Sequence, residues 1–145
     1  MISRLSRVAF LLLFLSMNFA HADGKSVTVL IHNDVKTTEL TSAQLRKIFS
    51  MRQTLWPDGT PIVVFVLPSQ HPAHQALCKD MLKMFPYQVE RIWNKLAYSG
   101  LGEKPIEVSS EQEMLERLRT TPGAIGYVME NTDFDNAQSL KITGG

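Results

Sequence analysis

Cysteine is almost absent from this chain, which has one, Cys78, in 145 residues. A single cysteine excludes an internal disulfide, even in an oxidising compartment. A zinc-type site is not indicated either, because the three histidines after residue 22 (His32, His71 and His74) have no cysteine or carboxylate at ligand spacing. The chain also lacks internal repeats and low-complexity segments. These features predict a fold held by its hydrophobic core, and we expect no metal and no cofactor.

An excess of basic charge is also missing. The chain has 15 Lys and Arg and 14 Asp and Glu. Two of the basic residues, Arg4 and Arg7, lie in the first 22 residues, which contain no acidic residue. The rest of the chain therefore has a net charge of 13 − 14 = −1. Without a basic excess or a basic run, nucleic acid and an acidic membrane surface are not expected partners.

The first 22 residues have the pattern of an export signal. Arg4 and Arg7 precede the apolar run Val8–Leu15, and Ala20-His21-Ala22 provides small residues for cleavage. The alternative is a membrane anchor, but the apolar run falls short of the roughly 20 residues that span a bilayer. We therefore predict a cleaved signal peptide over 1–22 and a periplasmic domain over 23–145. The remaining 145 − 22 = 123 residues suffice for one domain but not for two.

The pattern of apolar residues predicts alternating strands and helices. A β-branched run predicts a strand over 27–31, and the unbroken apolar run 62–67 predicts a strand covered on both faces. Between them, Thr41 and Gln44 have the spacing of a capping box at the start of a helix. Pro57-Asp58-Gly59 then predicts a turn.

The second half continues this alternation. A helix is predicted from His71 or Pro72, with Cys78 buried on its apolar face, and another from Pro86 to the glycine at 100. Ser110 with Glu113 predicts a second capping box before the strand 124–128. A last edge strand is expected at 140–143. The predicted class is α/β, with a mixed or mostly parallel sheet flanked by helices.

Loops at the carboxyl ends of strands are where open α/β sheets bind ligands. Here these loops are 33–41, 68–74 and the loop after Val128. The second contains side-chain donors beside a helix N-terminus, which favours anions. We therefore predict Ser69, Gln70, His71 and His74 as anion-binding residues. The alternative is an ordinary helix cap with solvated histidines, because the loop has no fixed positive charge.

Other residues give weaker signals. Trp56 and Trp93 are expected to anchor the core rather than to bind a ligand. Arg46, Lys47 and Arg52 could contact an anion or a partner, but a solvated helix face also explains them. No serine, histidine and acid set, paired carboxylates or phosphate-binding glycine loop stands out, so we predict that the protein is not an enzyme.

Four blocks resemble one protein family. They are LTSAQLRKIF (40–49), LWPDGTPIVVFV (55–66), IWNKLAYSGLGEKP (92–105) and TTPGAIGYV (120–128). In this order they are similar to phosphate ABC transporter substrate-binding proteins. The resemblance implies the type II periplasmic-binding-protein fold, here as a single three-layer lobe. It also implies a possible oxyanion ligand such as phosphate.

Two departures from the family qualify this expectation. Family members have two lobes that close on the anion, whereas 123 residues provide about one. Their phosphate loop carries an arginine and then Ser-Gly-Thr at a helix start. In this chain the arginine falls on an apolar position, and the triplet becomes Gln70, His71 and Pro72. We expect an exported, non-catalytic solute-binding-like protein with weak anion binding. The alternative is a ligand-free module that docks on a membrane sensor or transporter, and the oligomeric state is left open.

Overall fold

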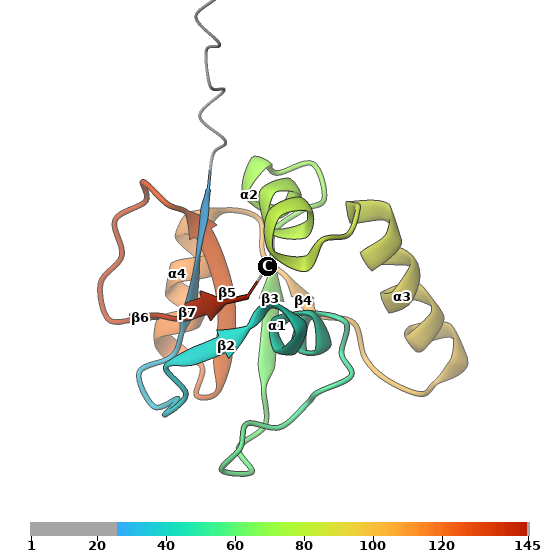
Figure 1. Cartoon of the computed structure of the whole chain (residues 1–145), viewed down its shortest axis with the longest axis horizontal. Coiled ribbons are helices and arrows are strands. Elements are labelled where there is room, and N and C mark those ends of the chain that lie inside the picture. The colour runs from blue at the N-terminus through green and yellow to red at the C-terminus, as the bar shows by residue number, and fades with distance from the viewer. Residues whose placement is uncertain (1–25, 145) are drawn as a thin grey trace, which may run out of the picture.

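Five strands form the central sheet of the computed structural model, which describes residues 26–144. The strands are β1 (Val27–Ile31), β3 (Val63–Val66), β4 (Ile106–Glu107), β5 (Ala124–Met129) and β6 (Gln138–Ser139). Their order is β4-β3-β5-β1-β6 (Figure 1). β3 is parallel to β4 and β5, whereas β1 is antiparallel to β5 and β6. The predicted α/β class with a mixed sheet is confirmed.

Helix α1 (Ser42–Phe49) begins at the predicted capping box. Thr41 Oγ1 accepts from the Gln44 backbone N–H at 3.1 Å, and the Gln44 side-chain oxygen accepts from the Thr41 N–H at 2.8 Å. Both groups satisfy donors that a helix start otherwise leaves free. Leu45, Ile48 and Phe49 are fully buried, so the apolar face predicted from their spacing is the face that packs on the core.

The predicted helix after the 62–67 strand divides into two kinds of helix. α2 (Pro72–Ala76) is α-helical, and η1 (Leu77–Leu82) continues it as a π-helix. The spacing of apolar residues fits an α-helix equally well, so the pattern did not predict the π-helix. η1 ends at Lys83, which adopts a left-handed conformation with φ of 56°. Helix α3 (Pro86–Ser99) follows, and Gly100 ends it in the predicted left-handed stop.

Helices cover both faces of the sheet, as the side chains of β5 show. Tyr127 points to the face covered by α1 and α2, where its ring lies 5.9 Å from that of Phe49. Gly126 points to the opposite face, where helix α4 (Glu111–Thr120) packs. A Cβ at Gly126 would lie 2.4 Å from Met114 Sδ, so glycine permits this close approach. The result is a three-layer lobe, with the outer helices visible around the sheet in Figure 1.

Both tryptophans anchor the core, as predicted. The indole N–H of Trp56 donates to the Gly123 carbonyl at 3.0 Å, and that of Trp93 donates to the Phe49 carbonyl at 2.8 Å. Trp93 thereby ties α3 to α1 rather than to the sheet. Buried tryptophans usually have such a partner, because an unpaired indole N–H is costly.

The predicted last strand joins a second, smaller sheet. β7 (Lys141–Thr143) pairs in parallel with β2 (Glu39–Thr41), while β6 supplies the outer strand beside β1. The carbonyl of Gly144 accepts a hydrogen bond from the Ser42 hydroxyl at the start of α1. The end of the described chain is therefore held against α1.

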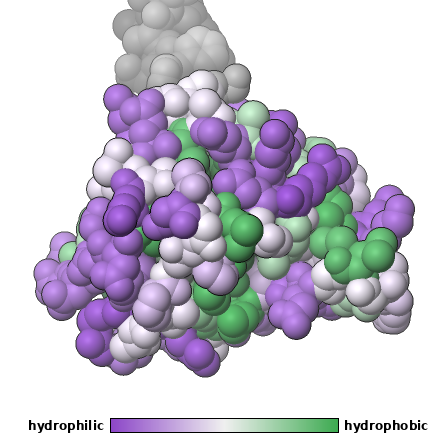
Figure 2. All heavy atoms as spheres, turned by 90° about the horizontal axis from the view of Figure 1, so that it is seen from below, coloured by the Kyte–Doolittle hydropathy of each residue, from purple (hydrophilic) through white to green (hydrophobic). Residues whose placement is uncertain are grey.

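The far end of α3 is exposed. Tyr98 is 90% and Leu101 83% exposed there. Figure 2, which views the molecule from below, shows hydrophobic residues both in the middle of this face and at the end where α3 lies. Within residues 26–144 no helix is long and apolar enough to cross a membrane. The predicted signal peptide lies outside the described residues.

Candidate functional site

The carboxyl edge of the three mutually parallel strands is the candidate ligand-facing edge. The loop 68–71 leaves β3, the loop 108–110 leaves β4, and the acidic loop from Glu130 leaves β5. The loop after β1 lies at the opposite edge, because β1 is antiparallel and Ile31 pairs with Ile125 at the start of β5. The 33–41 loop, which was predicted as a candidate ligand loop, is therefore separated from the other two. Strand direction could not be determined from apolar runs alone.

The 68–71 loop has fewer free donors than predicted. The His71 N–H donates to the Pro68 carbonyl at 2.9 Å, and Pro72 has no N–H. The Ala73 N–H donates to His71 Nδ1 at 3.1 Å, so the imidazole of His71, and not Ser69, caps α2. Ser69 is half-buried and Gln70 is exposed, and the loop contains no lysine or arginine. A bound anion would lack the charge-assisted bonds that strengthen such sites.

His74 lies in the core rather than with the other three predicted residues. Its side chain is 1% exposed. Nδ1 lies 2.5 Å from the Tyr127 hydroxyl, and Nε2 lies 3.5 Å from Cys78 Sγ. The Tyr127 hydroxyl also accepts from the Leu67 backbone N–H at 2.9 Å. The predicted set is thus divided, with Ser69, Gln70 and His71 at the surface and His74 joining α2 to β3 and β5.

Burial determines the protonation of this internal cluster. It lowers the pKa of His74, although the nearby carboxylate of Glu90 opposes the shift, so the imidazole is neutral at neutral pH. Burial raises the pKa of the Cys78 thiol to about 12, which removes the thiolate that a nucleophile needs. The spacing of four residues between His74 and Cys78 was the signal for their contact, and the sequence reasoning missed it.

Carboxylates of the chain itself occupy the donors beside this loop. Glu113 accepts from the Ser109 N–H at 2.7 Å and from its hydroxyl at 2.6 Å, and these bonds lower the pKa of Glu113. Glu111 accepts from the Met129 N–H at 2.5 Å, at the end of β5. The predicted box between Ser110 and Glu113 is therefore half formed, because the Glu113 side chain bonds Ser109 instead. Acidic residues in the first turn after a serine cap were the available signal.

The charge of this edge opposes an oxyanion. Glu107 ends β4, Glu130 follows β5, and both are exposed. Together with Glu111 and Glu113, they give the edge acidic side chains from both neighbours of β3. Their repulsion of an anion is reduced by water and salt at this exposed edge, but it adds no attraction.

The basic residues of α1 lie elsewhere. Arg46, Lys47 and Arg52 line a cavity of about 210 Å³ between α1 and the chain that links η1 to α3. All three are exposed. Arg46 is also oriented by the structure, since its Nε donates to the Leu82 carbonyl at 2.8 Å. The lining of this cavity includes no residue of the 68–71 loop.

Solved structures with this fold include phosphate-binding proteins. PstS from Borrelia burgdorferi matches with a TM-score of 0.64 and 19% identity, over 81% of this chain and 47% of that one. A structure from Clostridium perfringens is described as a phosphate ABC transporter substrate-binding protein with bound phosphate. It matches with a TM-score of 0.62 and 14% identity, over 81% of this chain and 45% of that one. An ABC-type phosphate transport receptor from Vibrio cholerae matches with a TM-score of 0.57 and 13% identity, over 81% of this chain and 46% of that one. The chain spans less than half the length of each.

No curated protein sequence matches the chain. A family model does match, over residues 24–143, and its description is PBP superfamily domain. This match and the shared fold confirm the resemblance stated above and the three-layer lobe predicted from it. The chain belongs to the PBP superfamily domain family and has the fold of one lobe of the phosphate-binding proteins that it resembles.

Proposed function

We propose that this protein is an exported, non-catalytic, single-lobe solute-binding-like protein that binds phosphate weakly when it is alone. Family membership and the phosphate-binding proteins of the same fold support the general class. One observation carries the weak binding: three backbone donors, one at the end of each parallel strand, are already paired with acceptors of the chain. Leu67 N–H is bonded to Tyr127, Ser109 N–H to Glu113, and Met129 N–H to Glu111.

The energetics support the same conclusion. A micromolar site needs about −8 kcal/mol of binding free energy. A helix N-terminus contributes about 0.3–1 kcal/mol, or up to ~2 when partly buried. Hydrogen bonds to charged groups add about 1.5–3 kcal/mol each, but the 68–71 loop contains no lysine or arginine to provide one. A single lobe also leaves the far side of the anion in water. Tight binding would need a second copy or another protein to complete the cleft.

The burial of Cys78 and His74 supports a non-catalytic role. Cys78 is buried and protonated, and His74 is enclosed by Tyr127, Cys78 and Trp93. In residues 26–144, no three His, Cys, Asp or Glu side chains lie close enough together to hold a metal ion. Export to the periplasm is proposed from the pattern of residues 1–22.

A second candidate is an interaction module that docks on a membrane sensor or transporter. The exposed end of α3 favours it, because Tyr98 and Leu101 present apolar surface to solvent. Large apolar side chains that gather on a surface often mark a contact with another protein.

A thermal-shift series with oxyanions tests the proposal. With 10 mM phosphate, a dissociation constant of 1 mM stabilises the fold by about 1.4 kcal/mol, whereas 1 µM stabilises it by about 5.4 kcal/mol. We expect phosphate to stabilise the fold by no more than about 1.4 kcal/mol, and sulfate to stabilise it equally. Sodium chloride of matched ionic strength is the control. A stabilisation of about 5.4 kcal/mol that is given by phosphate and not by sulfate would contradict the proposal.

A further inference from the structure

Two adjoining cavities form a basic groove on the helical face. The larger, of about 520 Å³, lies where η1 ends and α3 begins. The smaller, of about 210 Å³, lies beside α1. Met84 lines both, and we call the joint surface the Met84 groove. Its other lining residues are Ala43, Arg46, Lys47, Ser50, Arg52, Lys79, Lys83, Phe85, Gln88 and Ile92.

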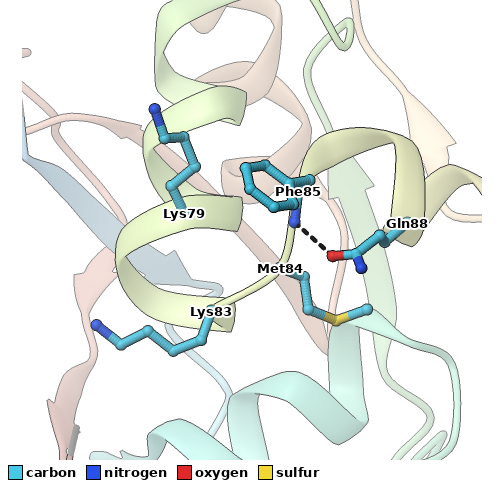
Figure 3. A pocket seen from close by; sticks show the side chains of 5 residues that line it. All are labelled: Lys79, Lys83, Met84, Phe85 and Gln88. Carbon is cyan, nitrogen blue, oxygen red and sulfur yellow. Dashed lines mark hydrogen bonds between the residues drawn. The ribbon is translucent and has the colours of Figure 1, made fainter.

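Positive charge is concentrated in this groove. Five of the 13 Lys and Arg residues after residue 22 line it, whereas none of the 14 acidic residues does. All five basic side chains are exposed, and none of them forms an ion pair with an acidic side chain of the described chain. Figure 3 shows Lys79 and Lys83 extending outward from η1 on one side of the larger cavity.

The inner surface of the groove is apolar. Met84 and Ile92 are half-buried, and Phe85 is 56% exposed beside them. Phe85 stacks on Tyr87 with the rings 5.7 Å apart, and its N–H donates to the Gln88 side chain at 2.9 Å (Figure 3). The stacking on Tyr87 restricts the Phe85 ring before any partner arrives, which reduces the entropy lost on binding.

We propose that the Met84 groove binds an acidic peptide segment with apolar side chains, presented by a partner protein. Carboxylates of the segment would pair with the surrounding lysines and arginines, and its apolar side chains would cover Met84, Phe85 and Ile92. A small oxyanion leaves that apolar surface uncovered. Met84 and Ile92 are half-buried at the bottom of the groove, where the side chains of a peptide reach them more readily than a flat bilayer does. The proposal rests on the second candidate function, and not on the phosphate affinity of the carboxyl edge.

Fluorescence anisotropy with a designed probe tests this. The probe is a labelled peptide of Asp, Glu, Leu and Phe, and its control replaces each acid by the matching amide. We expect the acidic peptide to bind about tenfold more tightly at low salt, and the difference to shrink at about 0.15 M salt as charges are screened. Equal binding of the two peptides would overturn the proposal.

Matched variants locate the binding. Lys47→Gln, Lys79→Gln and Lys83→Gln combined remove three charges from the groove; Arg46 is kept because it bonds the Leu82 carbonyl. The control combines Lys36→Gln, Lys104→Gln and Lys141→Gln, which are exposed and lie outside the groove. We expect affinity to fall about tenfold in the groove variant and less than twofold in the control. Phe85→Ser should weaken binding with all charges retained.

Three results would overturn the proposal. The first is equal peptide affinity in the groove variant and the control. The second is groove-dependent binding to anionic lipid vesicles without binding to the peptide. The third is self-association in sedimentation that the groove variant alone loses, which would identify a second copy as the occupant. The phosphate shift is measured separately, so failure here and failure of the weak-binding proposal can be distinguished.

Discussion

Removal of the Tyr127 hydroxyl, by Tyr127→Phe, should destabilise the lobe strongly. This hydroxyl is fully buried and serves two elements at once: it accepts from the Leu67 N–H at 2.9 Å and lies 2.5 Å from His74 Nδ1. The substitution keeps the ring, and with it the contact to Phe49. It therefore isolates the hydrogen bonds from the packing.

The expected magnitude follows from the groups left without partners. A buried donor or acceptor without a partner costs about 1–3 kcal/mol. Two such groups, on Leu67 and His74, predict a loss of about 2–4 kcal/mol after partial relaxation. A domain of this kind has a free energy of unfolding of about 5–15 kcal/mol, so the loss is a large fraction of it.

Urea unfolding, followed by circular dichroism, measures this loss. Tyr98→Phe is the matched control, because the same hydroxyl is removed from a side chain that is 90% exposed. We expect the control to change the free energy of unfolding by less than about 0.5 kcal/mol. If Tyr127→Phe behaves like the control, the internal cluster does not join α2 to the sheet as described.

Further predictions concern other parts of the molecule. The pKa of His74 is lower in the fold than the roughly 6.5 of an unfolded chain, so the unfolded state binds more protons. The free energy of unfolding should therefore fall as the pH drops below that value. His74→Gln should flatten this pH dependence, and the same dependence of stability on pH in both proteins would contradict the prediction. Gly126→Ala should cost about 1–3 kcal/mol, because its Cβ would press on Met114, whereas Gly102→Ala, whose Cβ meets nothing closer than 3.5 Å, should cost little in the same urea assay. Intact-mass analysis of exported protein should show a chain that begins at Asp23, and full-length protein in the membrane would exclude a cleaved signal.

Local sequence signals predicted most of the fold. The Thr41 and Gln44 box, the β-branched run at 27–31 and the glycine at 100 each specify a local structure that tertiary packing did not override. Strand direction and sheet membership were harder, because they depend on pairing between distant segments. The antiparallel β1 and the placement of β7 in a separate sheet are examples.

The candidate site was predicted less well than the fold. His74 was grouped with Ser69, Gln70 and His71 because of its position in the sequence, but helix rotation turns its ring into the core. Three-dimensional neighbours also decide whether a donor is free. The bond from Ser109 to Glu113 is local and could have been predicted, whereas those of Leu67 and Met129 cross between elements.

Titration calorimetry of phosphate into the isolated protein at near-physiological salt tests the central claim most directly. The paired donors, the acidic carboxyl edge and the single open lobe predict a dissociation constant above about 1 mM, or no measurable heat. This corresponds to a binding free energy less favourable than about −4 kcal/mol. A sub-micromolar dissociation constant for the monomer would contradict the account. It would mean that the carboxyl edge rearranges to free its donors, or that a basic cluster such as Arg46, Lys47 and Arg52 faces the ligand.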